Sequence, residues 1–462
     1  MKSKRKALIA AAAVLAVLVC AIALLSLAPQ KGDESERKIY ELIKHDDDDV
    51  KSVVISNEKG EYTVTKTGGE MVYSTPGLAG LPQTKENYYD LIHKCAVLTA
   101  SHKLNASAED YGKYGLDSPC ATASIEYESG EKATIHIGDS LKSEGFTYFL
   151  LEGDEHVYAG SENQFSYYFG DESMLLNTAL APGASLGATG QGNMSEPDYL
   201  RFPNKDGVEY IIETTDSFTD GYGNTFRHLQ QSPKKSFVDA AKLKEVFPRI
   251  MEFSADSAYI MHPTKQQLDS FAFDKPYTYI DIGIDGKMAK ISIVKYEGGY
   301  LAYKEGVDVI WKLADYLITW LDVESDTLTS HYFAAPSMAQ LFSLSVEVNG
   351  SSYLFERLDG DFACRGETIN KSSWEQLYKL ACSVNSYNSA EYDMGGNVAA
   401  KLVFLLESGE KETVELRQTE ARTLGIFING KNIGYTLREI FAERLAEGCE
   451  NALAGKSVSA SW

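Results

Sequence analysis

Two stretches far apart in the chain carry the same five residues, Glu-Ser-Gly-Glu-Lys, at positions 128–132 and 407–411. Each lies between two runs in which apolar and polar residues alternate. Alternation around a turn that contains glycine is typical of a β-hairpin with one buried face. At the offset between the two copies (407 − 128 = 279), Ile125 falls on Phe404. We therefore predict that the chain repeats one hairpin-forming unit, with Ile125 and Phe404 as equivalent buried residues.

A third, weaker copy lies between these two. Asp274-Lys-Pro276 aligns with Asp117-Ser-Pro119, ahead of a strand pattern that contains Ile280, Ile282 and Ile284. Each copy reads as a hairpin, a helix, a turn, a second hairpin and a second helix. This order predicts an α+β fold of three tandem related modules, built from antiparallel β-hairpins with packed helices. The predicted modules cover residues 50–182, 198–325 and 341–447, the third being the most divergent, with a Gly- and Ser-rich linker at 183–197.

Helical periodicity places the helices of these modules. Apolar residues recur three and four positions apart at 88–98 and at 243–251, where Pro248 predicts a kink or an early stop. In the third module, Ser372 and Glu375 match a capping box ahead of a helix that reaches residue 382. Closing helices are predicted near 161–169 and at 307–321, and residues 448–462 are predicted to form a frayed tail.

The N-terminus has the pattern of a membrane anchor. Four cationic residues precede residues 7–28, which carry no charge. Such a span is long enough to cross a bilayer, whereas signal-peptide cores are usually shorter. Cleavage after Ala28 is the alternative, and Pro29 would hinder it. We predict a cytoplasmic stub and a transmembrane anchor at 1–28, an acidic linker at 29–49 and a body outside the cytoplasm.

Charge and composition limit the classes of partner. The chain has 44 Lys and Arg against 66 Asp and Glu, a net charge of −22, which makes binding to nucleic acid unfavourable. The run Asp46–Asp49 places four carboxylates side by side, whereas a Ca²⁺ loop spaces its ligands at alternate positions and includes a glycine. This run therefore predicts a solvated loop.

Catalytic and metal-binding motifs are weak. Gly183-Ala-Ser185-Leu-Gly187 matches the nucleophile-elbow pattern, but that pattern needs a strand before the serine and a helix after it. Here loop-forming residues stand on both sides. No C-x-x-C motif is present, and Cys364 and Cys382 either pair in an oxidising compartment or remain free thiols. We predict no catalytic residue, no cofactor and no metal site.

Three segments carry a resemblance to a known family: KSVVISNEKGEYTVTK at 51–66, YGKYGLDSPCATASIEY at 111–127 and TIHIGD at 134–139. With these motifs the chain resembles the bacterial domain-of-unknown-function family number 4340. The resemblance is good over residues 50–182, recognisable over 198–325 and faint beyond 341. It implies an anchored envelope protein, often encoded beside ABC-type transport genes of the gliding-motility kind. The family has no established catalytic residues to carry over.

Together these observations predict a single-pass protein of the bacterial cytoplasmic membrane with an extracytoplasmic body. Its expected role is that of a scaffold or partner-binding protein, an accessory to an ABC-type transport system by the resemblance. The first alternative is a module that binds an envelope glycan or peptide, and the second is an envelope hydrolase. The aromatic residues expected to contact partners, or alternatively to form the core of the closing helices, are Tyr167, Tyr168, Phe169, Trp311 and Trp320.

Overall fold

The computed structural model describes residues 39–462, apart from residues 70, 107, 183–195, 249, 325, 331, 334, 386–387 and 390–395. The predicted anchor at 7–28 and Ser185 of the predicted linker lie outside the described residues. The chain divides into two compact units. The first unit ends at Met174 and excludes residues 80–84, and the second consists of residues 80–84 and Leu175–Trp462.

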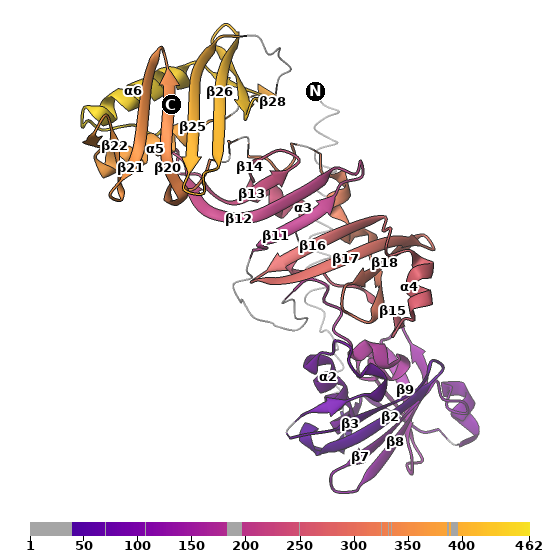
Figure 1. Cartoon of the computed structure of the whole chain (residues 1–462). Helices are drawn as coiled ribbons and strands as arrows, with labels where there is room; N and C mark the ends of the chain where they lie inside the picture. The colour runs from indigo at the N-terminus through magenta and orange to yellow at the C-terminus, as the bar shows by residue number, and fades with distance from the viewer. Residues whose placement is uncertain are drawn as a thin grey trace, which may run out of the picture. The chain divides into compact units, whose positions relative to one another are not determined.

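The first unit contains an eight-stranded antiparallel sheet, the first sheet, whose central strands are β2 (Val50–Asn57) and β7 (Ala121–Tyr127) (Figure 1). Helix α2 (Lys85–Ala96) contacts β2 and buries Leu91 and Ile92. Strands β1 (Tyr40–Lys44) and β5 (Val97–Ala100) form a separate antiparallel pair. The other strands are β3 (Gly60–Lys66), β4 (Tyr73–Ser74), β6 (His102–Leu104), β8 (Lys132–Leu141), β9 (Phe146–Leu151) and β10 (Val157–Ser161).

The second unit contains two nine-stranded antiparallel sheets, which are called the second and the third sheet in chain order. The central strands of the second sheet are β11 (Tyr199–Pro203) and β16 (Thr278–Ile284). Its helices are α3 (Ala240–Val246), which ends before Pro248 as predicted, and α4 (Lys265–Phe271). The other strands are β12 (Glu209–Thr219), β13 (Thr225–Ser232), β14 (Ser236–Phe237), β15 (Ser257–Met261), β17 (Lys287–Tyr296), β18 (Gly299–Lys304) and β19 (Val309–Leu313).

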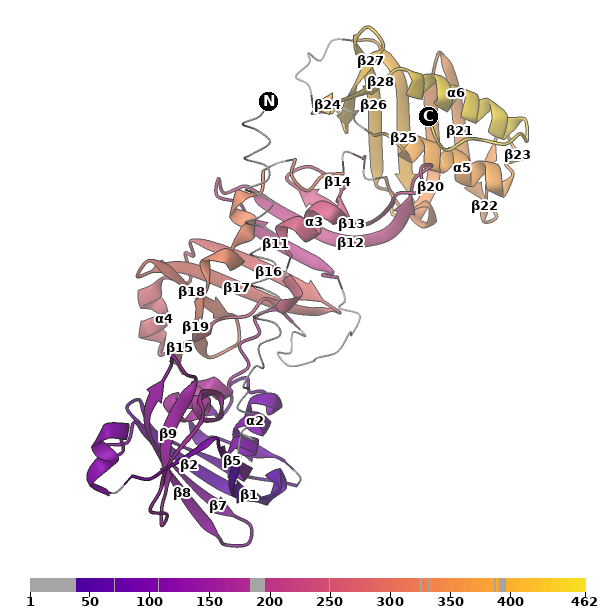
Figure 2. The ribbon, with the colours of Figure 1, turned by 180° about the vertical axis from the view of Figure 1, so that it is seen from behind.

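The third sheet has β20 (Leu341–Val348) and β25 (Val398–Leu406) at its centre. Helices α5 (Lys371–Cys382) and α6 (Ile440–Leu453) contact each other and lie across one face of this sheet (Figure 2). The other strands are β21 (Ser351–Leu358), β22 (Asp361–Cys364), β23 (Glu367–Thr368), β24 (Asn388–Ser389), β26 (Lys411–Glu420), β27 (Thr423–Ile428) and β28 (Lys431–Arg438). Three antiparallel sheets with packed helices confirm the predicted α+β class.

The three sheets share one strand order. In each sheet, the strands that follow the first central strand lie next to it in chain order towards one edge. The strands that follow the second central strand lie next to it in chain order towards the other edge. The last edge strand in each sheet, β6, β15 or β24, is the one that precedes the second central strand in the chain. The register of the central pairs agrees as well, since the facing residues are Val53 and Ile125, Leu200 and Ile282, and Leu344 and Phe404.

The helix predicted at 307–321 is wrong. This segment forms strand β19, which pairs with β18 and β15, followed by two 3₁₀ turns at Asp315–Leu317 and Thr319–Asp322. Val309 and Ile310 are β-branched, and such residues pack well on a pleated sheet. Periodicity alone does not distinguish a short apolar strand from a buried helix.

Other helices also differ from the prediction in type, cap or end. Residues 162–169 form a 3₁₀ helix instead of an α-helix. The cap of α5 is Asn370, whose side chain accepts hydrogen bonds from the main-chain N–H groups of Ser372 and Ser373, instead of the predicted capping box. The tail boundary predicted at residue 448 lies inside α6, which ends at Leu453. Local sequence rules locate helices better than their ends, because several polar residues in a row can each act as the cap.

Candidate functional site

The aromatic residues predicted to contact partners lie mostly in the core. Tyr168, Trp311 and Trp320 are at most 1% exposed, and Tyr167 and Phe169 are half-buried. For the three buried rings the interpretation as core residues therefore holds, because a fully covered ring presents no surface to another protein. Large aromatic side chains stabilise a fold more when they are buried than when they are exposed to solvent.

The outward face of the second sheet carries a row of alternating charges. Arg201 of β11 lies opposite Asp281 of β16, and Asp281 lies opposite Lys290 of β17. Glu305 continues the row just beyond β18, and its N–H donates to the main-chain oxygen of Lys290 at 2.9 Å. Side chains alternate between the two faces of a strand, so that Ile282, next to Asp281, points into the core.

Glu209 is the centre of a hydrogen-bond network beside this row. Its Oε1 accepts from the Tyr279 hydroxyl at 2.6 Å and from Arg201 Nε and Nη2 at 2.9 and 2.7 Å. The Tyr279 hydroxyl, and then Arg201, hold the pKa of Glu209 below its ordinary value. Burial, and then the bond to Glu209, raise the pKa of Tyr279 to about 12. The charge of Arg201 is therefore matched by Glu209.

Asp281 is less well compensated. The residue is only 9% exposed, and its carboxylate accepts no hydrogen bond from any described residue. The nearest cationic atom is Arg201 Nη1, at 3.9 Å. Burial raises the pKa of Asp281, and the charges of Arg201 and Lys290 offset only part of that effect. A buried carboxylate without hydrogen bonds destabilises a fold, which makes this position a candidate for binding.

The row and the network line a cleft of about 510 Å³. Three rings belong to its wall, those of Phe273, Tyr279 and Tyr303. Residues of α4 and of the segment after it form the opposite side. Four carboxylates and two cations line the cleft, which makes it acidic overall: Asp269, Asp274, Asp281 and Glu305 against Arg201 and Lys290.

The other two sheets have no charge at the corresponding places. The positions that match Arg201, Asp281 and Lys290 follow from the shared register of the central strands. They are Val54, Ser124 and Thr134 in the first sheet, and Ser345, Val403 and Thr413 in the third. Of the three sheets, only the second therefore has charged residues at these equivalent positions.

The sequence patterns above predicted no site at Asp281, although one signal for it is present. Asp281 interrupts the apolar strand Thr278–Ile284 at an outward position, where the aligned repeats have serine and valine. A comparison of outward positions between the repeats would have identified Asp281. It would not have identified Arg201 as its neighbour, because that pairing depends on the strand register.

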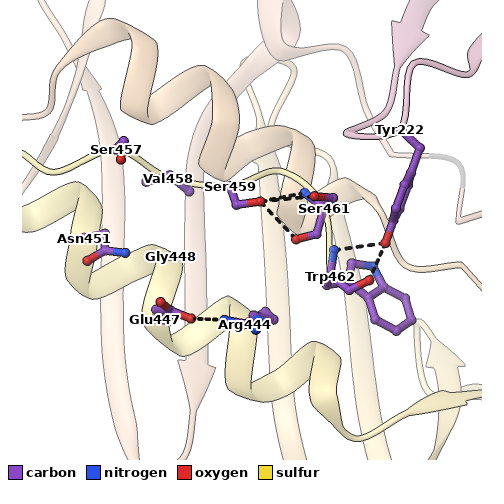
Figure 3. Close-up of a pocket in the computed structure, with 10 residues that line it drawn as sticks. All are labelled: Tyr222, Arg444, Glu447, Gly448, Asn451, Ser457, Val458, Ser459, Ser461 and Trp462. Carbon is purple, nitrogen blue, oxygen red and sulfur yellow. Dashed lines mark hydrogen bonds and ion pairs between the residues drawn. The ribbon is translucent and has the colours of Figure 1, made fainter.

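A second, more polar cleft of about 620 Å³ lies between α6 and the C-terminal tail (Figure 3). The Tyr222 hydroxyl accepts a hydrogen bond from the main-chain N–H of Trp462 at 3.0 Å and donates to the main-chain oxygen of the same residue. On α6, Arg444 is paired with Glu447 at 2.6 Å. The two hydrogen bonds of Tyr222 therefore help to hold the end of the tail in place.

The Tyr222 loop is itself held by a buried carboxylate. Asp220 is 3% exposed and accepts hydrogen bonds from the Tyr332 hydroxyl at 2.6 Å and from the main-chain N–H groups of Tyr222 and Asn224 at 2.8 Å. Burial alone would raise the pKa of Asp220, but these hydrogen bonds lower it overall. The loop that contacts Trp462 is therefore rigidly supported.

Across the described residues, no group of three or more His, Cys, Asp or Glu side chains is able to hold a metal ion. Cys364 and Cys382 are both buried free thiols. No helix within the described ranges is long and apolar enough to span a bilayer. The Asp run before β2 forms a 3₁₀ turn at Asp47–Asp49.

Comparison with known proteins gives a single assignment. Residues 74–276 match the model of a family described as Domain of unknown function (DUF4340), and this match confirms the resemblance inferred from the sequence. No curated protein and no solved structure matches the chain. The match includes Arg201 and Glu209 and ends just before β16, which carries Asp281.

Proposed function

We propose that this chain, a DUF4340 family protein over residues 74–276, is a non-catalytic partner-binding protein of the cell envelope. In this proposal the cleft on the second sheet binds a cationic segment of the partner. One observation carries the proposal: the Asp281 carboxylate is buried in an acidic, aromatic cleft and accepts no hydrogen bond from the described residues. An incoming ammonium or guanidinium group would supply the missing donors.

The charge and the rings of the cleft favour a cation over other ligands. Desolvation penalises the ionised form of Asp281, and an opposite charge at close range would stabilise that form. The face of Tyr303 can also attract a cation, whereas Tyr279 already has the guanidinium carbon of Arg201 at 5.7 Å from its ring centre. The positive charges already present are engaged, since Arg201 pairs with Glu209, and Lys290 lies 3.5 Å from Glu305.

We further propose that the three sheets are copies of one module, of which the second has been specialised for binding. The shared strand order and the common register of the central strands support this interpretation. The first and third copies would then serve as scaffold. A binding site can be added to one copy of a shared fold without changing that fold.

Site-specific crosslinking tests the binding site. A photo-reactive residue at Ser292, which lines the cleft, should crosslink one specific membrane protein in intact cells. Subunits of an ABC-type transporter are the partners that the family resemblance suggests. The matched control is His136, which faces Thr122 in the first sheet as Ser292 faces Tyr279 in the second. Asp281→Asn should reduce the crosslink from Ser292 severalfold, and an undiminished crosslink would contradict the proposal.

Glycan binding is the main competing function, because rings and carboxylates also line sugar sites. The purified chain should bind the peptide Lys-Leu-Lys more tightly than the neutral sugar maltotriose. Asp281→Asn should weaken peptide binding about tenfold, as expected for the loss of a hydrogen bond to a charged group. Tight binding of maltotriose together with no response to Lys-Leu-Lys would favour the glycan-binding alternative.

The membrane location is a separate part of the proposal and rests on the uncharged segment at 7–28. We propose that this segment anchors the chain with its N-terminus in the cytoplasm and its body outside. Protease added to spheroplasts should then degrade the body while the cytoplasmic membrane stays intact. Complete protection, or release of a soluble form that starts near Pro29, would contradict the anchored topology.

A further inference from the structure

The cleft on the second sheet has an apolar wall, formed by Leu268, Phe273 and Tyr303. Leu268 of α4 packs against a buried cluster that contains Phe273, from the segment after the helix, and Leu301 of the sheet. The ring centroids of Phe273 and Tyr303 lie 5.6 Å apart. Packing within the second unit therefore holds this wall in place.

Asp281 lies at the base of the cleft and can be reached from it. The residue is only 9% exposed, whereas Asp269 and Asp274, on the opposite side of the cleft, are exposed. Neither carboxylate oxygen of Asp281 is among the polar atoms of the described residues that are both unpaired and fully covered. A group that enters the cleft can therefore contact this carboxylate directly, and the carboxylates at the rim attract a cation towards it.

The two oxygens of the Asp281 carboxylate differ in their distance from Arg201. The closest approach between the two side chains is 3.9 Å, from Arg201 Nη1 to Asp281 Oδ2, so Oδ1 lies farther from the guanidinium. Lys290, the neighbour of Asp281 on the other side, is paired with Glu305 at 3.5 Å. A cation that binds through Oδ1 alone is therefore repelled less by Arg201 than one that binds through both oxygens.

This difference favours an ammonium over a guanidinium. A guanidinium is less strongly hydrated and easier to bury, but it binds a carboxylate best through two parallel hydrogen bonds, which need both oxygens. In this cleft such a bond would bring its charge close to Arg201. An ammonium is a compact charge with three donors, one of which can bond to Oδ1 alone. The methylene groups of a lysine can meanwhile pack on Phe273 and Tyr303.

We propose that the cleft selects a primary alkylammonium group, which binds through Asp281 Oδ1 while its aliphatic stem lies against the apolar wall. This proposal rests on the proposed function, since it names the chemical class of the cation that enters the same cleft. The group is either a lysine side chain of a polypeptide or the end of a linear polyamine. Arg201 is then a specificity-determining residue, because its charge disfavours a guanidinium at Oδ2.

Tripeptides with blocked ends isolate the contribution of one side chain. The affinity of acetylated and amidated Leu-Lys-Leu for the purified full chain is measured by isothermal titration calorimetry. It should bind at least about fivefold more tightly than the arginine peptide. It should bind at least about tenfold more tightly than the trimethyllysine peptide, which keeps the charge but has no N–H donor. Cadaverine represents the polyamines, and the tighter of cadaverine and Leu-Lys-Leu identifies the source of the ammonium group.

Arg201→Gln tests the role of Arg201 in this selection. The variant removes the charge beside Oδ2 and keeps an amide that can donate to Glu209. The preference for the lysine peptide over the arginine peptide should fall below about twofold. Lys287→Gln is the matched control, because Lys287 is exposed at the start of β17 and does not line the cleft. It should leave the preference unchanged.

The results distinguish a failure of the selection from a failure of cation binding. Equal affinities for the lysine and arginine peptides, both weakened in Asp281→Asn, would overturn the selection and leave cation binding by the cleft intact. Tightest binding of the trimethyllysine peptide would overturn it as well, and an undiminished preference in Arg201→Gln would overturn the role of Arg201. No binding of any of these cations, or affinities unchanged in Asp281→Asn, would overturn this proposal and the proposed function together.

Discussion

Glu128 and Glu407 have the same main-chain partner in their respective sheets. The N–H of Glu128 donates to the oxygen of Asp49 at 2.8 Å, and the N–H of Glu407 donates to that of Gln340 at 2.9 Å. Each acceptor is the last residue of the 3₁₀ turn that leads into the sheet. In both sheets, the repeated five-residue turn is thus hydrogen-bonded to the 3₁₀ turn that precedes the first central strand. This shared contact gives a physical reason for the recurrence of the turn.

Burial of the repeat cores can be tested in both units separately. Ile125→Asp and Phe404→Asp should each cost more than about 3 kcal/mol, because both side chains are at most 1% exposed and a carboxylate there would be unpaired. Ile125 belongs to the first compact unit and Phe404 to the second. Scanning calorimetry should show a different transition lowered in each variant. Loss of one and the same transition in both would contradict independent units.

Asp281→Asn should stabilise the protein at neutral pH. The pKa of Asp281 is raised in the folded state, so the folded chain binds the proton more tightly than the unfolded chain. Its favourable contribution is present below the ordinary pKa of 3.8 and is lost as the pH rises through the raised folded value. The variant should have a Tm on the order of 2 °C higher at pH 7. Asp285→Asn, in the exposed turn of the same hairpin, is the control for the change of side chain and should shift Tm by less than Asp281→Asn does.

Tyr279→Phe should show the opposite dependence on pH. The Tyr279 hydroxyl is the largest of the effects that lower the pKa of Glu209. A lowered pKa stabilises the folded state above the ordinary value of 4.5, and this stabilisation is lost as the pH falls. Removal of the hydroxyl should therefore cost about 1 kcal/mol at pH 7 and less in acid. Urea unfolding at several pH values measures the difference, and a penalty that grows towards acid would contradict the network.

Tyr222→Phe should loosen the C-terminal tail. The variant removes the hydroxyl that bonds to Trp462 and leaves the loop held by Asp220 in place. Limited proteolysis should then cleave after Leu453 several times faster than in the parent, with no change in the global Tm. Ser459→Ala is a control, since its hydroxyl bonds only within the tail, to Ser461. Equal cleavage rates in the parent and in Tyr222→Phe would show that the tail is held by other contacts, such as the packing of Trp462 on Phe441.

Much of the fold could be predicted from local patterns. Alternation of period two located the strands that carry Ile125 and Phe404, and helical spacing located α2 and α5. Both signals depend on residues close together in the sequence, because strand and helix geometry repeat over a few residues. The turn Asn349-Gly350 has positive φ at both residues, which is the conformation that an Asn-Gly pair favours in a hairpin. The same local rules failed for β19, whose apolar run fits strand and helix equally well.

The sequence by itself determined which residues form the buried faces and that one hairpin pattern recurs. Only the tertiary structure decided which outward residues become neighbours. Arg201, Asp281 and Lys290 come from three different strands, and no short-range pattern links them. Their contact depends on strand register, in which a shift by one residue would turn each side chain to the other face.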